Sequence, residues 1–270
     1  VATFMSKIKI NKEKIPFPYR IHDTPDIEKL RPYVAFARKF GYKFDMKDEK
    51  AIAQSFNQLL LDVKGKPEQL VLEQLGIRTM AKAEYSTDNI GHYGLGFRNY
   101  CHFTSPIRRY PDVMVHRLLQ EALNNKVHID EKMEEKCKHS SERERAAMEA
   151  ERAGNKYEQV LFMMDKLGEE MDGVISGVSS FGFWVETINE KCEGLVSIRD
   201  LSDYDDFRQD ETNYCLEGIR TGRKFRMGDL VHVKLVATNL DKRQLDFEWI
   251  PDIKSSSNKE NRKKSKNNKK

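Results

Sequence analysis

The 270-residue chain lacks any long apolar run, and no stretch approaches the roughly 20 apolar residues that a membrane-spanning helix needs. It also lacks a visible secretory signal, because the opening residues VATFMSKIKINKEK contain no apolar core followed by a small-residue cleavage site. It has only four cysteines, at positions 101, 137, 192 and 215, and their spacing fits neither a disulfide framework nor a zinc site. We therefore expect reduced thiols, a cytoplasmic location and no membrane partner.

Negative charge is scarce at the C-terminus. Residues 254–270 carry eight Lys or Arg and one Glu, a net +7, whereas the whole chain carries +4, which leaves −3 for the preceding 253 residues. The tail has no apolar residue to bury, so it is predicted to be disordered. We expect it to hold polyanions without sequence specificity, with structured RNA or the ribosome as candidate partners. A solubilising end without a partner is the alternative.

Hydrophobic residues recur with helical periodicity through the first 168 residues. Thr24 and Pro25 predict the cap and the first position of one helix, and Pro32 predicts a kink within it. A proline-free segment over about residues 131–167 predicts one long helix. Its expected buried stripe consists of Ala146, Ala150, Ala153, Tyr157, Val160, Leu161 and Met164.

From residue 170 onward the hydrophobic period changes to two. The segments GVISGVSSFGFWVETI, CEGLVSI, DLVHVKLVAT and RQLDFEWI read as short strands separated by Gly, Asn and Asp turns. Roughly 80 residues with this many short strands suit a small closed barrel. The sequence therefore predicts an α+β protein in which a mostly helical region precedes a β-barrel and a basic tail.

The segment FTSPIRRYPDVMVHR, residues 103–117, combines two prolines with three arginines and a histidine. The residues before Pro106 suit a helix N-terminus, where free backbone N–H groups and the helix dipole attract anions. Two adjacent guanidinium groups follow, and a guanidinium can grip a phosphate with two hydrogen bonds. The candidate anion site comprises Thr104, Ser105, Arg108 and Arg109. On residue types alone, an ordinary solvated arginine face is an equal alternative.

Pro111 predicts the start of a second helix, with Asp112 in its first turn, where the dipole favours a negative charge. Asp112 and His116 are four residues apart on one face, so they can hydrogen-bond. The alternatives are that Asp112 only caps its helix and that His116 is a buried, satisfied imidazole. The residue types give little support to Ser105 and His116 as a nucleophile and its base.

The longer segment GHYGLGFRNYCHFTSPIRRYPDVMVHR resembles the signature of the ribonuclease II and ribonuclease R family. The resemblance extends through YRIHDTPDIEKL upstream and SERERAAMEAERA downstream, and it covers about residues 17–250. SPIRRYPD and the basic tail are closer to the ribonuclease R branch. The resemblance implies part of an RNB catalytic domain over residues 1–168. It also implies an S1-type RNA-binding module, a five-stranded OB-fold barrel, over residues 169–251, before the disordered tail at 252–270.

The resemblance also implies an activity, which is processive hydrolysis of RNA from its 3′ end to nucleoside 5′-monophosphates, with magnesium ions held by aspartates. Arg108, the arginine of SPIR, would grip the scissile phosphate, and Thr104, Ser105 and Arg109 would line the same path. Glu151 in AER would touch the terminal nucleotides, although a salt-bridged helix face is the alternative. The expected partner is single-stranded RNA, or RNA with a 3′ overhang, bound by a monomer.

In the barrel segment, FGFWV places Phe181 and Trp184 at the two aromatic positions that stack on bases in the family. Phe183 between them is expected to lie in the core. Ser197 stands where the family commonly has a histidine. The other expected RNA contacts on the barrel are Lys234 and Arg243.

Two features of the family are missing from the sequence: the metal-binding aspartate cluster, and the cold-shock modules that precede the catalytic domain. The nearest acidic cluster, Asp203, Asp205 and Asp206, matches no catalytic motif. Val1 also falls inside what should be a helix. We therefore expect the C-terminal part of an exoribonuclease, inactive by itself and without a metal site of its own. A stand-alone RNA-binding protein that lacks catalysis is the alternative.

Overall fold

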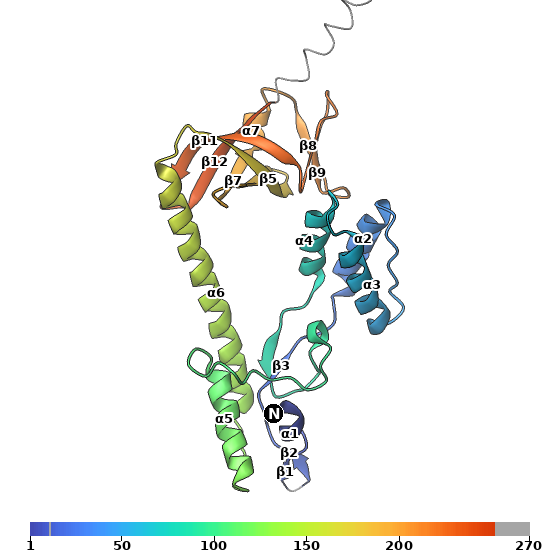
Figure 1. Cartoon of the computed structure of the whole chain (residues 1–270), viewed down its shortest axis with the longest axis vertical. Helices are drawn as coiled ribbons and strands as arrows, with labels where there is room; N and C mark the ends of the chain where they lie inside the picture. The colour runs from blue at the N-terminus through green and yellow to red at the C-terminus, as the bar shows by residue number, and fades with distance from the viewer. Residues whose placement is uncertain (11, 252–270) are drawn as a thin grey trace, which may run out of the picture. The chain divides into compact units, whose positions relative to one another are not determined.

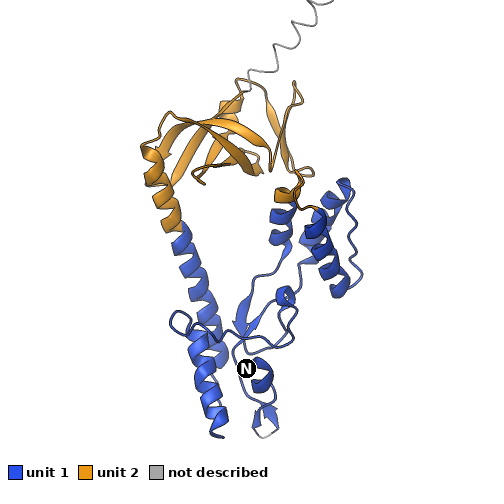
Figure 2. Cartoon of the chain, viewed as in Figure 1, with its two compact units in different colours: residues 1–62, 72–152 blue, residues 63–71, 153–270 orange. Residues whose placement is uncertain are grey.

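The computed structural model describes residues 1–10 and 12–251, which fall into two compact units (Figures 1 and 2). Unit 1 comprises residues 1–62 and 72–152, and unit 2 comprises residues 63–71 and those from Ala153 onward. The tail predicted to be disordered lies outside the described residues. Among the described residues, no helix is both long and apolar enough to cross a membrane.

The first 164 residues are mainly helical, and the sites discussed below lie where α5 and α6 meet the two-stranded sheet of β3 and β4. These strands are antiparallel, with Arg20 opposite Tyr85. The elements in chain order are α1 (Ala2–Met5), β1 (Lys9–Ile10), β2 (Glu13–Lys14), β3 (Tyr19–Ile21), α2 (Ile27–Lys39), α3 (Glu49–Asp62), α4 (Gln69–Thr79), β4 (Glu84–Ser86), the 3-10 helix η1 (Tyr93–Leu95), α5 (Tyr110–Leu123) and α6 (Met133–Met164).

Helix α2 begins two residues after Pro25, the predicted first position. It begins at Ile27, and its cap is Asp26, whose carboxylate accepts a hydrogen bond from the backbone N–H of Glu28 at 2.9 Å. Pro32 lies inside the helix without ending it. A proline removes a single backbone hydrogen bond, and the apolar face that α2 buries outweighs that loss. This face consists of Leu30, Tyr33, Val34, Phe36 and Ala37.

Helix α6 is continuous over 32 residues, as predicted, but most of its expected apolar stripe is not buried. It is buried instead near its two ends, through Met133 and Cys137 in the core of unit 1 and through Val160 and Met163 in the barrel core. The exposed members of the predicted stripe are Ala146, Ala150, Tyr157, Leu161 and Met164. The described residues therefore leave the middle of this helix uncovered.

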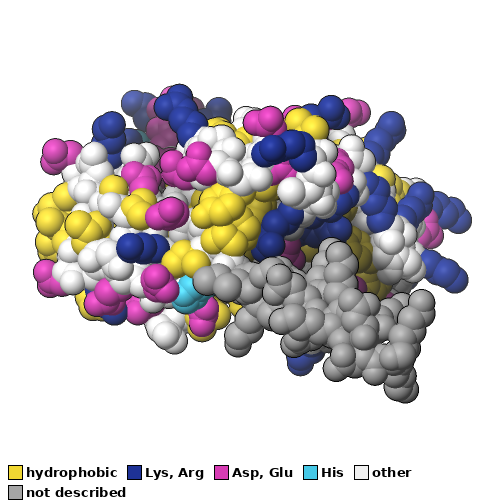
Figure 3. Space-filling model, turned by 90° about the horizontal axis from the view of Figure 1, so that it is seen from above, with side chains coloured by type: hydrophobic (Ala, Val, Ile, Leu, Met, Phe, Trp, Pro, Cys, Tyr) yellow, Lys and Arg dark blue, Asp and Glu magenta, His cyan; other side chains and the backbone are white. Residues whose placement is uncertain are grey.

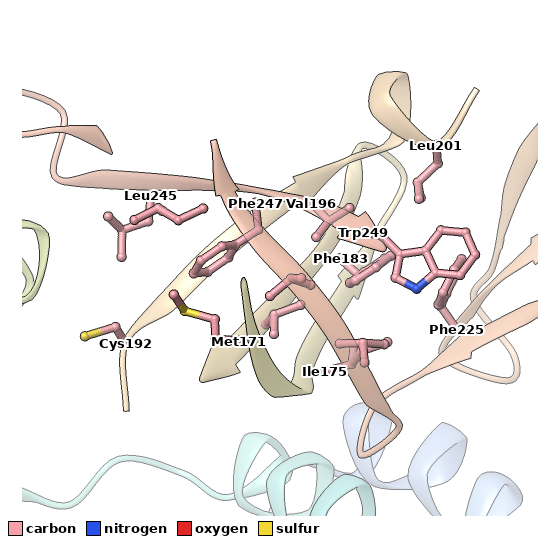
Figure 4. Packing of buried hydrophobic residues seen from close by; sticks show 14 of the residues in the cluster. Met171, Ile175, Phe183, Cys192, Val196, Leu201, Phe225, Leu245, Phe247 and Trp249 are labelled. Atoms are coloured by element: carbon pink, nitrogen blue, oxygen red, sulfur yellow. The ribbon is translucent and has the colours of Figure 1, made fainter. Parts of the chain in front are cut away.

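Unit 2 contains a closed five-stranded barrel with the strand order β11-β12-β7-β6-β5, which confirms the predicted barrel. Neighbouring strands are antiparallel except for β12 and β7, which are parallel. The strands are β5 (Glu170–Ser179), β6 (Gly182–Thr187), β7 (Glu193–Ser197), β11 (Leu230–Asn239) and β12 (Gln244–Ile250). Their inward residues share one apolar core with Phe225, which comes from the segment between β7 and β11, and Phe183, Phe225 and Trp249 make successive ring contacts in it (Figure 4).

Between β7 and β11 the chain adds a short helix and a three-stranded sheet that the sequence did not predict. These elements are α7 (Ile198–Leu201), β8 (Phe207–Asp210), β9 (Cys215–Gly218) and β10 (Lys224–Arg226). The carboxylate of Asp205 anchors this insertion by accepting hydrogen bonds from the hydroxyl of Thr221 at 2.6 Å and from its backbone N–H at 2.8 Å. These bonds hold the pKa of Asp205 well below its usual range, so this acid has a structural role.

The barrel wall leaves no room for a side chain at Gly194 of β7. A Cβ atom there would lie 2.4 Å from ring carbon Cε2 of Phe247 and 2.8 Å from the carbonyl oxygen of Leu245. Real Cβ atoms do not approach other atoms so closely, so only glycine fits without a shift of the wall.

We expect Gly194→Ala to lower the free energy of unfolding of the barrel by about 1–3 kcal/mol, the usual cost of overpacking. The matched control is Gly154→Ala in α6, where a new Cβ meets nothing within 4 Å. The control should raise stability by about 0.5–1 kcal/mol, because alanine favours a helix over glycine. Denaturant titrations followed by fluorescence and circular dichroism measure both, and two changes of the same sign would contradict this account.

His232 on β11 joins two carboxylates of β5. Its Nδ1 lies 2.8 Å from Oδ1 of Asp172, and its Nε2 lies 3.2 Å from Oε2 of Glu170. Hydrogen bonds to Asp172, and then to Glu170, raise the pKa of His232 above its ordinary value of 6.5. The protonated imidazole therefore stabilises the fold fully below pH 6.5, and this contribution is lost as the pH rises through the folded-state pKa.

We expect His232→Gln to destabilise the chain most below pH 6.5, and the difference from wild type to shrink as the pH rises through the raised folded-state pKa of His232. Thermal melts of both proteins across this range give the difference. A gap between the two melting temperatures that is constant with pH would contradict the ionic contribution.

Candidate nucleic-acid interface

An open cavity of about 730 Å³ in unit 1 is bounded by β4, by the segment leading into α5, and by α6. It brings together three residues predicted from the sequence, Arg108, Arg109 and Glu151. The other lining residues are Tyr85, Tyr110, Pro111, His139, Ser140, Arg143, Glu144, Ala147 and Met148. Thr104 and Ser105 lie on the adjoining stretch of chain and do not line the cavity.

The residues around Pro106 form a turn, not the helix N-terminus that the sequence predicted. The backbone N–H groups of Arg108 and Arg109 both donate to the carbonyl oxygen of Ser105, at 3.3 and 3.1 Å. Pro111 lies in the first turn of α5, where its missing N–H and fixed φ are tolerated, so the helix begins here and does not include the preceding turn. The chain therefore makes one tight turn, residues 105–109, and α5 begins after it.

Asp112 and His116 do not bond to each other as expected; both hold the segment that precedes α5. The fully buried carboxylate of Asp112 accepts hydrogen bonds from the backbone N–H of Ser105 at 2.7 Å and from Nη2 of Arg109 at 2.9 Å. Nε2 of His116 lies 2.8 Å from the carbonyl oxygen of Phe103, and the two rings stack 4.2 Å apart. The 105–109 turn is thus fastened to the helix that follows it.

The two adjacent arginines have different surroundings. Arg109 is only 19% exposed and is paired with Asp112. Arg108 is exposed, and its guanidinium makes no hydrogen bond or ion pair with any described residue. Arg108 is therefore the arginine whose donors are available to a ligand in the cavity.

A network that the sequence did not predict forms one wall of the cavity. Nη1 of Arg20 lies 2.6 Å from Oε2 of Glu144, and its guanidinium lies 4.6 Å from the centre of the Tyr85 ring. The hydroxyl of Tyr85 lies 2.7 Å from Nδ1 of His102. Burial raises the pKa of Tyr85 to about 12, and burial together with Arg109 and Arg20 lowers the pKa of His102 to about 4. Both rings are consequently neutral near pH 7.

Helix α6 carries Glu151 on its exposed surface, and the predicted alternative, a salt-bridged helix face, is not what its neighbours form. Arg145, Glu149 and Arg152 line a second cavity of about 330 Å³ in unit 1, together with Arg20. Within the described part of the chain, no ion pair joins these three helix residues. Glu151 lines the first cavity, and none of these three residues forms an ion pair with its carboxylate.

On the barrel, Phe181 and Trp184 lie together on the outer surface. Phe181 is 53% exposed, Trp184 is half-buried, and their ring centres are 5.2 Å apart in an edge-to-face arrangement. Phe183 is fully buried, as predicted, and its ring lies 4.7 Å from that of Phe225. Ser197 caps α7 by accepting a hydrogen bond from the backbone N–H of Arg199 at 3.2 Å.

Lys234 and Arg243 are not brought into one site with the aromatic pair. Lys234 lies on β11, which does not pair with β6, and its cross-strand neighbours are Glu170 and Glu248. Arg243 is exposed in the turn between β11 and β12. On the face shown in Figure 3, cationic, anionic and hydrophobic side chains are interspersed, without a broad area of one sign.

The magnesium ions implied by the resemblance do not fit the described residues. In residues 1–10 and 12–251, no group of three or more His, Cys, Asp or Glu could hold a metal ion. Asp205, at the centre of the acidic cluster, already accepts hydrogen bonds from Thr221 and Arg220.

Two family models and several known proteins match this chain. Residues 2–125 match the family model described as the RNB domain, and residues 165–249 match the S1 RNA binding domain. Ribonuclease R of Aquifex aeolicus is 41% identical over 239 residues, which are 87% of this chain and 34% of that protein. The chain belongs to the ribonuclease II and ribonuclease R family.

Other members of the ribonuclease II and ribonuclease R family agree with this placement. Ribonuclease R of Escherichia coli is 34% identical over 254 residues, 89% of this chain and 31% of that protein. The apo form of Mycoplasma genitalium RNase R superposes with a TM-score of 0.78 at 27% identity, over 88% of this chain and 38% of that one. The same protein in complex with ribose methylated single-stranded RNA gives the same values. The chain thus spans about a third of the length of its curated relatives.

Proposed function

We propose that the chain forms part of a 3′-to-5′ exoribonuclease that hydrolyses RNA processively to nucleoside 5′-monophosphates. It would supply the arginine that grips the scissile phosphate and a barrel that binds RNA. The observation that carries the proposal is an exposed, unpartnered Arg108 on a fastened turn beside a cavity of about 730 Å³. The ribonuclease R relatives, and the Mycoplasma genitalium structure solved with single-stranded RNA, support RNA as the partner.

The roles of the cavity residues follow from their chemistry. A guanidinium presents planar N–H donors that match two oxygens of a phosphate. The charge on those oxygens grows in the transition state, so a fixed Arg108 stabilises that state more than the bound substrate. Glu151, across the cavity on α6, can accept hydrogen bonds from the hydroxyl groups of a terminal ribose. Thr104 and Ser105 would contact the strand as it enters.

The barrel would hold RNA outside the cavity. Phe181 and Trp184 offer ring faces on which bases of any sequence can stack. Lys234 and Arg243 would make separate contacts to the phosphate backbone, and Lys234 the weaker one, because two glutamates flank it. The tail, residues 252–270, would add nonspecific attraction for structured RNA or the ribosome.

A catalytically incomplete RNA-binding protein is the second candidate, and the absence of a metal-binding cluster from the described residues favours it. The two candidates differ in the coding sequence upstream of Val1. A continuous reading frame that contains an aspartate cluster supports the exoribonuclease, and an in-frame stop or a start codon immediately before Val1 supports the binding protein. In either case we propose a monomer in the cytoplasm, and four free cysteines support the reducing compartment.

We expect the 270-residue chain alone to be inactive as a nuclease, because its described residues offer no ligand set for the magnesium ions that we propose for the complete enzyme. The test incubates the chain with end-labelled single-stranded RNA and magnesium. Steady release of nucleoside monophosphates that stops when the metal is chelated would contradict this expectation.

Within the complete enzyme, we expect Arg108→Ala to slow turnover by about a hundred- to a thousandfold, the usual effect of removing one preorganised donor. RNA affinity should fall far less, because many other contacts hold the strand. Arg108→Lys should recover only part of the rate, since an ammonium group cannot form the two-bond fork.

Single-turnover kinetics on these variants separate the chemical step from binding. Arg117→Ala, which removes an exposed arginine from α5, the helix that follows the 105–109 turn, is the matched control and should leave both constants near wild type. If Arg108→Ala instead shows near-normal turnover and a collapsed affinity, Arg108 is a binding residue and its catalytic assignment is wrong.

For the isolated chain, we expect the paired change Phe181→Ala and Trp184→Ala to weaken RNA binding by about 1–3 kcal/mol per lost stacked base, with little change in salt dependence. Deleting residues 254–270 should instead flatten the slope of log affinity against log salt. Fluorescence anisotropy at several salt concentrations measures both, and Tyr157→Ala on α6 is the exposed-aromatic control. Identical effects of the two changes would contradict the assignment of base stacking to the barrel and electrostatic attraction to the tail.

A further inference from the structure

We propose that Asp112 is the positioning residue for Arg108, and that Arg109 is the buried counter-ion of Asp112 and not a contact to RNA. This inference rests on the proposed function, in which Arg108 grips the scissile phosphate. Its basis is one atom, Oδ2 of Asp112, which accepts hydrogen bonds from the backbone N–H of Ser105 and from the guanidinium of Arg109.

These two bonds close a ring around the 105–109 turn. Ser105 begins the turn and Arg109 ends it, so the carboxylate ties both ends to the first helical turn of α5. Within the ring, the N–H of Arg108 donates to the carbonyl oxygen of Ser105. The backbone of Arg108 can leave its position only if this closed set of bonds is broken, and its side chain is therefore presented to the cavity from a fixed base.

Burial explains why Arg109 belongs to Asp112. The carboxylate of Asp112 is fully buried, so its charge needs a partner inside the protein. Removing one member of a buried ion pair leaves the other charge uncompensated, which costs more than removing both. Arg109 lines the cavity, but its charge is committed to this carboxylate, and a phosphate that drew the guanidinium away would leave Asp112 uncompensated.

Two further atoms of the pair point to the same assignment. Oδ1 of Asp112 and Nε of Arg109 are buried and have no hydrogen-bond partner among the described residues. An arginine commonly grips a carboxylate through two parallel N–H···O bonds. A small rotation of the guanidinium would let Nε donate to Oδ1 as the second bond of such a fork. The unused donor of Arg109 thus matches the unused acceptor of Asp112.

The kinetic test uses the complete enzyme with Asp112→Asn, Arg109→Gln and the double variant. Asp112→Asn keeps an acceptor for the N–H of Ser105 but leaves the guanidinium of Arg109 unpaired. We expect it to lower kcat by about ten- to a hundredfold, since small displacements of a reacting group can cost that much, and to leave KM nearly unchanged. The double variant removes both charges, so it should recover a substantial part of the lost kcat.

A direct contact between Arg109 and RNA would give a different kinetic result. If Arg109 binds RNA, Arg109→Gln raises KM by itself and the double variant shows the product of the two single effects, which would overturn the proposal. Glu131→Gln, which removes one exposed carboxylate from the same unit, controls for the change in net charge.

A parallel thermal-unfolding cycle on the 270-residue chain separates this inference from the proposed function. A double variant that melts higher than the Asp112→Asn variant supports the buried pair, whereas additive shifts in melting temperature, or equal loss of the fold in both, would overturn it. A complete enzyme without ribonuclease activity would refute the proposed function, and the unfolding cycle would still decide whether the pair exists.

Discussion

The buried carboxylate of Asp112 is the constraint on which the candidate site depends. It lies in the first turn of α5, where the helix dipole favours a negative charge, and it converts the residues before the helix from a free loop into a closed turn. Because it also neutralises Arg109, it leaves Arg108 as the free member of this arginine pair at the cavity. The difference between two neighbouring arginines of identical chemistry is therefore produced by one acid three residues further along the chain.

In the cavity wall that contains Tyr85 and Glu144, charged side chains again divide into those paired within the fold and those free to interact with a ligand. Arg20 is paired with Glu144 and lies over the ring of Tyr85, and the hydroxyl of Tyr85 is hydrogen-bonded to Nδ1 of His102. The neutral Tyr85 and His102 add no charge to the wall near pH 7. A phosphate entering the cavity would thus meet a field set mainly by Arg108 and the adjoining Arg143.

Local chemistry allowed the sequence to predict the barrel and the long helix, whereas Arg108 was distinguished from Arg109 through the family resemblance. Alternation of period two and turn residues suffice for short strands, and a run of strong helix formers without proline suffices for α6. The predictions that failed, and the contacts that were missed, depend on interactions that the local sequence pattern does not show. The Arg20–Tyr85 contact needs the pairing of strands that are more than sixty residues apart, and Pro32 was tolerated because of packing that periodicity alone does not reveal. Asp112 was assigned to the wrong partner, because helical spacing suggested His116 while the turn before the helix offered the closer donors.

The uncovered middle of α6 has a consequence for how the chain moves. Between its buried ends, this helix is held by its own backbone bonds, by the ion pair of Glu144 with Arg20 and by the intrinsic preference of Ala, Glu and Arg for helix, with little apolar cover from the described residues. Isolated helical segments of this kind open in local fluctuations long before the whole protein unfolds. Amide hydrogens in the middle of α6 should therefore exchange with solvent sooner than those at either end, which makes the centre of the longest helix the softest part of its length.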